Sequence, residues 1–283
     1  MNEIQIVSGH GAWRGGFEER VLAGYRAAGC SEPLAQALLE RALKGIDDWT
    51  VATDGTGWIA VEVAEDNGAT VGRIHDLTVP QGREWAERWC AEHGAQRVEV
   101  RLSGAAGAFA DYPVRGQIRM RAAAERPELP PGLTVRRLTE DEYPGWYAGE
   151  EAAYVADIVR AGALTPEQAK EKSDRDFARY LPQGYLTPGH AFYALEADGG
   201  VVGTGWVNHG FLPGATFGFS LEVYEEHRGK GYGRAAMAVG EWATRQGGDE
   251  AMMFNVFGGN EVAMSLYDST GFAVLDEFRS IEL

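Results

Sequence analysis

Basic residues and glycines gather at one point of an otherwise acidic stretch of the chain. The cluster is Arg228, Gly229, Lys230, Gly231, Tyr232, Gly233 and Arg234. It follows a predicted strand that ends at Val223 and opens a predicted helix. Glycines allow a tight turn and a close approach of the backbone to a ligand. The unpaired amides and the positive end of a helix attract an anion. The pattern therefore predicts a bound phosphate or pyrophosphate.

Other motifs with known chemistry do not fit this sequence. A P-loop requires GxxxxGK(S/T) and a dinucleotide fingerprint requires GxGxxG, and the cluster supplies neither. No His/Cys group has the spacing of metal ligands, and no GxSxG nucleophile motif occurs. We therefore expect no metal. A glycine-rich turn whose basic side chains are only solvated is the alternative interpretation of the cluster.

Two motifs resemble those of one enzyme family. Arg228-x-x-Gly231-x-Gly233, after a strand that ends Ser-Leu-Glu-Val, resembles the acyl-CoA-binding loop of the GNAT superfamily of N-acetyltransferases. The stretch from Asn260 to Phe272 resembles the family signature Asn-x-x-Ala-x-x-Leu-Tyr-x-x-x-Gly-Phe, with its tyrosine at Tyr267. The resemblance covers residues 133–283 well and residues 49–120 only as a decayed copy.

The resemblance implies a role for each matched residue. The backbone of Leu221–Val223 would pair with the pantetheine arm of acetyl-CoA, and the loop Arg228–Arg234 would hold its pyrophosphate. Asn260 would contact the pantetheine. Tyr267 would lie near the thioester sulfur as the general acid. General physical chemistry agrees, because such a cofactor needs an anion cradle, a free strand edge and a proton donor near sulfur.

The general base is less clearly marked. Glu222 lies on the strand that would carry the reacting centre, six residues before Arg228. A carboxylate partly buried there would have a raised pKa and could take a proton from an ammonium through water. The family often places its base nearer Phe217 or Gly218, where this sequence has no titratable group. A solvated glutamate at the strand edge is the other interpretation of Glu222.

Acidic and aromatic residues alternate on one predicted helix. Glu150, Tyr154 and Asp157 stand at positions i, i+4 and i+7 and so share one helical face. Carboxylates beside an aromatic ring suit an ammonium-bearing guest. These three residues are the predicted substrate-binding set, with a merely solvated helix face as the alternative.

The apolar pattern predicts an α/β fold, with a mixed sheet and helices on both faces. For the second half we expect a strand at Thr134–Leu138, helices near Tyr143–Arg160 and Pro166–Tyr180, strands at Phe192–Glu196, Val201–Asn208 and Ala215–Val223, a helix near Gly231–Gln246, a strand at Ala251–Val256, a helix at Asn260–Ser269 and a strand at Phe272–Ile281. In the first half, helices near Gly16–Ala28 and Pro33–Lys44 fit the same plan.

The chain contains an internal repeat. Trp49–Val79 matches Tyr193–Val223 at an offset of 144, and Arg83–Tyr112 matches Gly240–Ser269 at an offset of 157. The offsets differ by 13 residues, and only Pro-Gln-Gly stands where the second half carries its basic loop. Ala110 also stands opposite Tyr267, and Ser103 opposite Asn260. We expect a degenerate first domain, residues 1–120, a linker, 121–132, and a catalytic domain, 133–283.

Charge and composition restrict the kinds of molecule that this protein is expected to bind. The 283 residues carry a formal charge of −16, which disfavours nucleic acid and anionic membranes. Residues 127–283 hold 24 acidic and 12 basic residues, which favours a cationic guest, although a merely solubilising acidic surface is the alternative. Two cysteines, no signal peptide and no membrane span predict a cytoplasmic protein.

Together these features predict two tandem GNAT-like domains, each with a mostly antiparallel central sheet flanked by helices, and an acetyl-CoA-dependent N-acetyltransferase. The expected acceptor is the primary amine of a small cationic molecule. An aminoglycoside or cationic peptide antibiotic is preferred, in resistance or self-protection. An acceptor amine on a protein or polyamine, and an acetyl-CoA sensor or scaffold without turnover, are the alternatives. A homodimer is compatible with the sequence.

Overall fold

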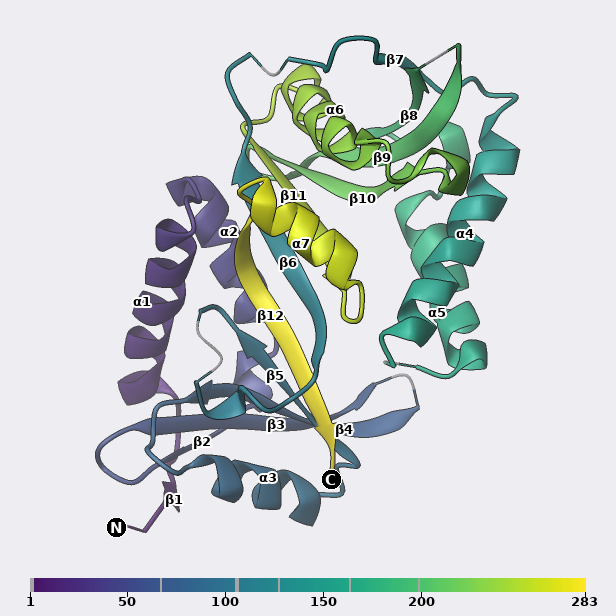
Figure 1. Ribbon diagram of the computed structural model, residues 1–283. Coiled ribbons are helices and arrows are strands. Elements are labelled where there is room, and N and C mark those ends of the chain that lie inside the picture. Colours follow the sequence, from purple (N-terminus) through teal and green to yellow (C-terminus); the bar gives the residue numbers. More distant parts are fainter. Residues whose placement is uncertain (1–2, 67, 105–106, 127, 163, 198) are drawn as a thin grey trace. The chain divides into compact units, whose positions relative to one another are not determined.

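The computed structural model describes most of the chain. The described residues are 3–66, 68–104, 107–126, 128–162, 164–197 and 199–283. The chain forms two compact units. The first comprises Met1–Ala28, Ala35–Gln117 and Val274–Leu283, and the second comprises Gly29–Leu34 and Ile118–Ala273. Figure 1 shows the elements of both units along the chain.

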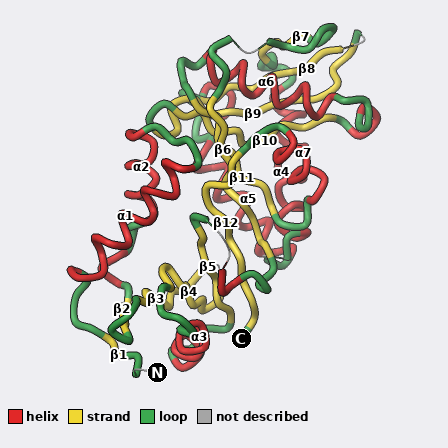
Figure 2. Tube along the Cα trace, turned by 60° about the vertical axis from the view of Figure 1, so that its left-hand side comes forward, coloured by secondary structure: helices red, strands yellow, loops and turns green. Residues whose placement is uncertain are grey.

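The first unit is built on a sheet of order β1-β2-β3-β4-β5-β12-β6. Its elements are β1 (Gln5–Ile6), α1 (Gly11–Ala27), α2 (Glu32–Ala42), β2 (Thr50–Thr53), β3 (Trp58–Asp66), β4 (Ala69–Leu77), α3 (Arg83–Glu92), β5 (Arg97–Leu102), the start of β6 (Val114–Ala122) and nearly all of β12 (Ala273–Glu282). Helices lie on both sides of β3 and β4, as Figure 2 shows for α1 and α3. Helix α3 begins directly after Gly82, without the long basic loop of the second half.

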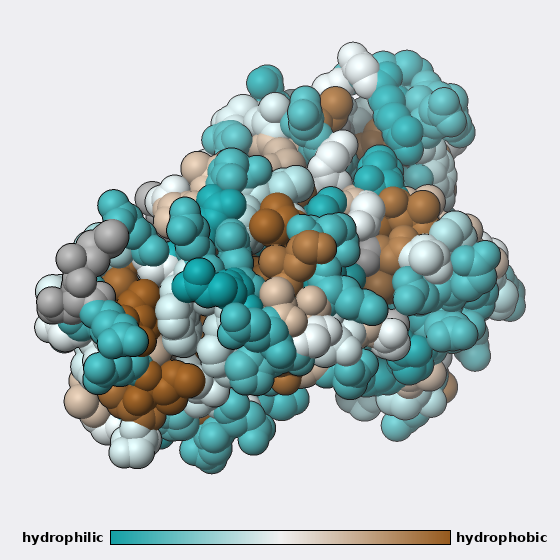
Figure 3. Space-filling view, turned by 90° about the horizontal axis from the view of Figure 1, so that it is seen from below, coloured by the Kyte–Doolittle hydropathy of each residue, from teal (hydrophilic) through white to brown (hydrophobic). Residues whose placement is uncertain are grey.

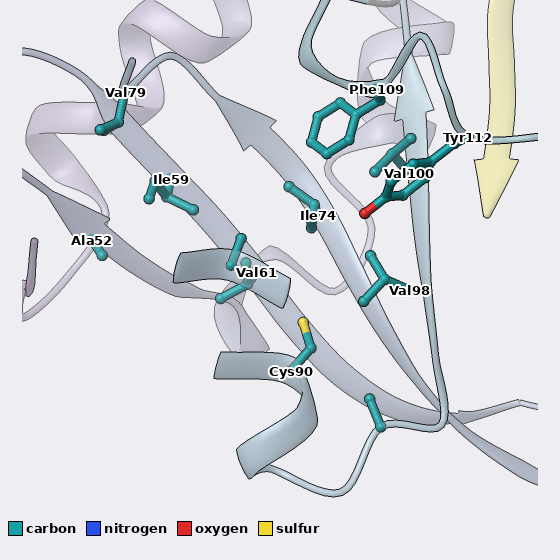
Figure 4. Close-up of a cluster of buried hydrophobic side chains, with 12 residues drawn as sticks. Ala52, Ile59, Val61, Ile74, Val79, Cys90, Val98, Val100, Phe109 and Tyr112 are labelled. Carbon is teal, nitrogen blue, oxygen red and sulfur yellow. The ribbon is translucent and has the colours of Figure 1, made fainter. Parts of the chain in front are cut away.

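The core of the first unit lies between α3 and strands β3 to β5. Cys90 of α3 is directed toward Val61, and Phe109 and Tyr112 lie beside Val100 (Figure 4). This close packing of α3 depends on a glycine, because a Cβ at Gly72 would lie 2.6 Å from the Cys90 Cβ. The first unit therefore has a hydrophobic core of its own.

The second unit continues from β6 in the order β6-β11-β10-β9-β8-β7. Its elements are β7 (Thr134–Arg137), α4 (Tyr143–Arg160), α5 (Pro166–Tyr180), β8 (His190–Ala197), β9 (Gly200–Leu212), β10 (Ala215–Val223), α6 (Tyr232–Gln246), β11 (Ala251–Phe257) and α7 (Glu261–Ser269). Helix α6 packs on one face of β8 and β9, and α4 and α5 pack on the other (Figure 1). Strands β7 to β10 are antiparallel, and β10 and β11 are parallel. The α/β class and the mixed, mostly antiparallel sheet are confirmed.

The last strand of the chain belongs to the first unit. Strand β12 pairs antiparallel with β5, from Glu277 opposite Leu102 to Glu282 opposite Arg97. The buried Asp276 carboxylate lies 2.7 Å from Arg101 Nη2 and accepts a hydrogen bond from the Tyr25 hydroxyl at 3.1 Å. In turn, β6 continues past the predicted boundary and lies beside β11 in the second unit. The two halves have exchanged their final strands.

This exchange requires the predicted domain bounds to be corrected. The second unit ends at Ala273 rather than at residue 283, because β12 completes the sheet of the first unit. The predicted linker, 121–132, begins inside β6, and Arg121 is held by Glu241 at 2.8 Å and by the Thr270 carbonyl at 2.7 Å. Pro127 of this segment lies outside the described residues.

Within the described ranges, no helix combines the length and the apolar character that crossing a bilayer requires. The same residues contain no group of three or more His, Cys, Asp or Glu side chains arranged to hold a metal ion.

Candidate functional site

Strand β10 carries an irregularity where the site begins. Its ladder with β9 pairs Gly218 with Val207 and then Ser220 with Trp206, so Phe219 is an extra residue that forms a β-bulge. The parallel ladder between β10 and β11 ends at Gly218, opposite Phe254. Beyond this point the described strands diverge, and the backbone of Leu221–Val223 is paired only on its β9 side. A free edge of this kind can pair with the amides of an extended ligand.

The basic loop leads from β10 into α6. Gly229 and Gly231 have φ angles of 75° and 89°, which L side chains rarely adopt, and a Cβ on either would meet no atom within 4 Å. Gly231 is the N-cap of α6, and the first turn of the helix contains no acidic residue. The basic side chains Arg228, Lys230 and Arg234 are exposed. The loop thus presents open backbone, a helix N-terminus and three cations, which together suit a pyrophosphate.

Arg228 also reaches back toward the strand. Its Nε donates a hydrogen bond to the Val223 carbonyl at 3.1 Å, and its Nη2 lies 3.7 Å from Glu222 Oε1. The loop and the end of β10 are therefore in direct contact. The predicted contacts of Leu221–Val223 with pantetheine and of Arg228–Arg234 with pyrophosphate therefore fall on adjoining segments of the chain.

Helix α7 carries the second predicted motif. Asn260 is its N-cap, and Asn260 Oδ1 accepts a hydrogen bond from the Ala263 amide at 3.2 Å. Leu266 anchors α7 against α6, because a Cβ at Gly233 would lie 3.3 Å from Leu266 Cδ2. Asn260 therefore has a structural task in addition to its predicted contact with pantetheine.

The ring of Tyr267, on α7, is fixed by packing, and its hydroxyl stays protonated. Its ring centroid lies 4.4 Å from that of Phe254. Burial raises the pKa of Tyr267 above its ordinary value, with a smaller opposing effect from Arg119. Among the described residues its hydroxyl has no hydrogen-bond partner. A neutral phenol with an uncommitted O–H is the state that a general acid needs.

Glu150 of α4 faces the bulge of β10. It is 8% exposed, and its Oε1 accepts a hydrogen bond from Ser220 Oγ at 2.7 Å. Burial raises the pKa of Glu150 to about 7; the hydrogen bond from Ser220 opposes this shift, and the charge of Glu222 adds to it. Glu150 thus changes its charge close to neutral pH.

A cavity of about 300 Å³ lies beside Glu150, and we call it the acceptor cavity. Its lining consists of Leu138, Glu142, Gly145, Trp146, Gly149, Glu150, Val201, Thr204, Glu222 and Tyr224. Burial also raises the pKa of Glu222, an effect that Arg228 opposes. Two buried polar groups of the lining, the Trp146 indole and the Thr204 hydroxyl, oppose through side-chain hydrogen bonds the effect by which burial raises the pKa values of Glu150 and Tyr224 respectively. The cavity therefore combines two carboxylates with two buried polar groups.

The other predicted substrate-binding residues lie outside this lining. The Tyr154 hydroxyl donates to Asp176 Oδ2 at 2.7 Å and so ties α4 to α5. Asp157 forms an ion pair with Arg160 at 2.6 Å on the surface of α4. Asp157 remains close enough to raise the pKa values of Glu150, Glu222 and Tyr267. The structure thus brings Glu150 and Glu222 together but not the whole predicted face.

The sequence analysis missed four residues of this site: Trp146, Thr204, Ser220 and Tyr224. One signal was present for Trp146, which stands four residues before Glu150 and so shares its helical face. No comparable signal marks Ser220, because its partner lies 70 residues earlier in the chain.

Comparisons with known proteins agree with this geometry. Residues 145–272 match the model of the acetyltransferase (GNAT) family. An uncharacterized N-acetyltransferase of Bacillus subtilis, YycN, is 32% identical over 148 residues, which cover 50% of this chain and 94% of that protein. A mycothiol acetyltransferase of Nocardiopsis dassonvillei is 34% identical over 161 residues, which cover 54% of this chain and 48% of that protein.

One solved structure is similar to this chain over both units. The crystal structure of a GCN5-related N-acetyltransferase from Sphaerobacter thermophilus covers 99% of this chain and 98% of its own, with 18% identity and a TM-score of 0.53. That match shows a shared two-domain fold. The chain belongs to the GNAT family of acetyltransferases, which use acetyl-CoA.

Proposed function

We propose that the second unit transfers the acetyl group of acetyl-CoA to the primary amine of a small cationic acceptor that binds in the acceptor cavity. The observation that carries this proposal is the pair of carboxylates, Glu150 and Glu222, in the lining of that cavity. Both are partly or fully withdrawn from water, which strengthens their attraction for a cation. Glu222 also lies beside Arg228 of the basic loop, so the cavity adjoins the expected cofactor site.

The remaining lining favours an acceptor that also carries oxygen. The buried indole N–H of Trp146 is a hydrogen-bond donor, and the Thr204 hydroxyl can accept or donate. A hydroxyl or carbonyl oxygen on the guest could hydrogen-bond with these groups. An amino sugar or a peptide offers an ammonium together with such an oxygen, whereas a simple polyamine offers only nitrogen.

Aminoglycosides and cationic peptide antibiotics meet these chemical requirements, and resistance or self-protection is the biological role that follows. The net charge of −16 adds a long-range attraction for cations. The face of the molecule in Figure 3 is mainly hydrophilic, with separate hydrophobic areas. Because several relatives are mycothiol acetyltransferases, the acceptor of those enzymes belongs in any substrate panel.

Different residues of the second unit bind acetyl-CoA, bind the acceptor and donate the proton. Acetyl-CoA, when bound, supplies an acetyl thioester that is open to attack by an amine. The Leu221–Val223 edge and the Arg228–Arg234 loop hold it in place, and Glu222 attracts the ammonium end of the acceptor. Tyr267 donates its proton to the departing sulfur. The first unit lacks the basic loop and serves as a scaffold, so titration calorimetry with acetyl-CoA is expected to give one site per chain.

Release of free thiol from acetyl-CoA tests the proposal. The panel comprises aminoglycosides, peptide antibiotics, polyamines, peptides and the mycothiol-type acceptor, each beside its N-acetylated form as a control. Turnover is expected with amino sugars or cationic peptides and not with the acetylated controls. Glu222→Gln should raise KM for a cationic acceptor, whereas Glu226→Gln, which changes an exposed residue outside the cavity, should not. Turnover with polyamines alone would contradict the proposed acceptor class.

A further inference from the structure

The acceptor amine must lose a proton before it can attack a carbonyl, and the bulge of β10 offers no group to take it. Phe217, Gly218 and Phe219 have no titratable side chain, and Ser220 carries a hydroxyl that ionises far above neutral pH. Ser220 completes the bulge, and its hydroxyl is hydrogen-bonded to Glu150 of α4 at 2.7 Å. The two carboxylates nearest to the bulge are therefore Glu150 of α4 and Glu222, farther along β10.

We propose that Glu150 is the general base that deprotonates the acceptor amine, and that Ser220 is the positioning residue that holds its carboxylate toward the reacting centre. This inference rests on the proposed function, because it needs an amine in the acceptor cavity. Glu150 lines that cavity, and the hydrogen bond from Ser220 Oγ to its Oε1 fixes the carboxylate beside the bulge of β10.

The proton and electron balance is complete with these groups. The ammonium of the acceptor gives one proton to the Glu150 carboxylate and becomes a free amine. The lone pair of the amine nitrogen then forms a C–N bond with the acetyl carbon. The C–S bond breaks, and sulfur leaves with its electron pair and takes the Tyr267 proton. The nitrogen loses its second proton as the amide forms, and this proton passes through water to the tyrosinate. Glu150 then releases to solvent the proton that it took, which restores the carboxylate.

Glu222 is the competing base, and its surroundings argue against it. Its side chain is 40% exposed, and Arg228 lies 3.7 Å away and favours its ionised form. Glu150 is 8% exposed, and burial, with the charges of Glu222 and Asp157 added to it, disfavours its ionised form. A base works best when its pKa lies near the working pH, and the pKa of Glu150, at about 7, meets that condition.

Other charged or titratable groups face this carboxylate from several elements. They are Glu142 at the N-cap of α4, Asp157 on α4, Glu222 on β10, Tyr224 directly after β10, Arg136 through its ion pair with Glu142, and Arg228 through its contact with Glu222. The charges of Glu222 and Asp157 raise the pKa of Glu150, and Arg228 opposes the raised pKa of Glu222. A cationic acceptor entering the cavity lowers that affinity again.

The first test compares Glu150→Gln, Glu222→Gln and Ser220→Ala, each with the thiol-release assay across pH 5.5 to 9. Wild-type kcat/KM should fall below pH 7 with one apparent pKa near 7. Glu150→Gln keeps the size of the side chain and an acceptor for Ser220, so acetyl-CoA affinity by calorimetry should be unchanged. Its kcat should fall about 10²-fold or more, and the acid limb should disappear. Glu222→Gln should keep the acid limb.

The second test needs no turnover. In protein labelled with ¹³C at the glutamate side-chain carboxyl, one resonance should titrate near pH 7 and should be missing in Glu150→Gln. In Ser220→Ala the same resonance should titrate at higher pH, because the lost hydrogen bond stabilised the carboxylate. A Glu150 resonance that titrates near 4.5, or a Glu150→Gln enzyme within threefold of wild type, overturns the inference. Failure of every acceptor to release thiol overturns the proposed function instead, and the titration still decides the state of Glu150.

Discussion

The guanidinium of Arg228 lies 3.7 Å from the carboxylate of Glu222, while its Nε donates to the Val223 carbonyl. One side chain thus links the anion loop, the free strand edge and the acceptor cavity. Arg228 therefore occupies a backbone acceptor on the segment that we expect to pair with pantetheine.

Replacing Arg228 should weaken acetyl-CoA binding through its pyrophosphate. Arg228→Gln removes a charge-assisted hydrogen bond; such bonds contribute about 1.5–3 kcal/mol, and the exposure of this loop places the loss near the lower end, at roughly tenfold in Kd. Calorimetry measures it. Pantetheine, which lacks the pyrophosphate, is the control and should bind both proteins equally. An equal loss for pantetheine would mean that Arg228 acts through the strand.

Gly231 offers a matched pair of variants. Its φ of 89° is strained for any L residue, yet a Cβ there meets nothing within 4 Å. Asparagine and aspartate are the side-chain-bearing residues that tolerate this conformation best, and they differ only in charge. Saturating acetyl-CoA should raise the Tm of Gly231→Asn, and Gly231→Asp should abolish the shift. Equal shifts would show that no anion binds at the N-terminus of α6.

Tyr267→Phe should separate chemistry from binding. The phenylalanine ring keeps the contact with Phe254, so folding and acetyl-CoA affinity should change little. The proton donor is lost, and kcat should fall by about 10² to 10⁴. Because burial raises the pKa of Tyr267, the wild-type phenol stays protonated throughout the neutral range. Steady-state kinetics checks this prediction, and a variant within threefold of wild type would make Tyr267 a packing residue only.

The buried Glu150 should make stability depend on pH in a definite direction. Its folded-state pKa of about 7 lies above the unfolded value near 4.5, so the folded state binds the extra proton. The stabilisation is complete below pH 4.5 and is lost as pH rises through 7. It amounts to something on the order of 3 kcal/mol. Urea unfolding at pH 5 and pH 8 should show this loss in wild type and not in Glu150→Gln. Glu226→Gln, an exposed site, should behave as wild type.

Division of the chain at Pro130-Pro131 should give two fragments that fold poorly alone. The first fragment lacks β12, which pairs with β5, and the second lacks β6, which lies beside β11. Each would expose an unpaired strand edge, which promotes aggregation. Co-expression of the two fragments should restore a soluble complex that gives a single melting transition. A second fragment that is soluble and fully active by itself would contradict the exchange.

The sequence patterns predicted the bounds of helices better than they predicted which strands pair and which side chains meet. Helices α4 and α5 begin and end where the apolar periodicity placed them, because proline near the N-terminus of each and a loss of periodicity at the end are local signals. The basic loop could be predicted for the same reason, because its residues are adjacent in the sequence. The pairing of β12 with β5 could not be predicted, because the two related halves offer β12 nearly equivalent strand edges. Nor could the orientation of Glu150 be predicted, since only packing against Ser220 distinguishes it from the other carboxylates of α4.

The exchange of β6 and β12 also has a consequence for synthesis on the ribosome. Strand β5 emerges early, but the strand that covers its edge is among the last segments of this chain to be made. The first unit must therefore wait, incompletely paired, while most of the second unit is translated. Each unit takes a strand from the other part of the chain, so neither part contains all the strands of its own unit.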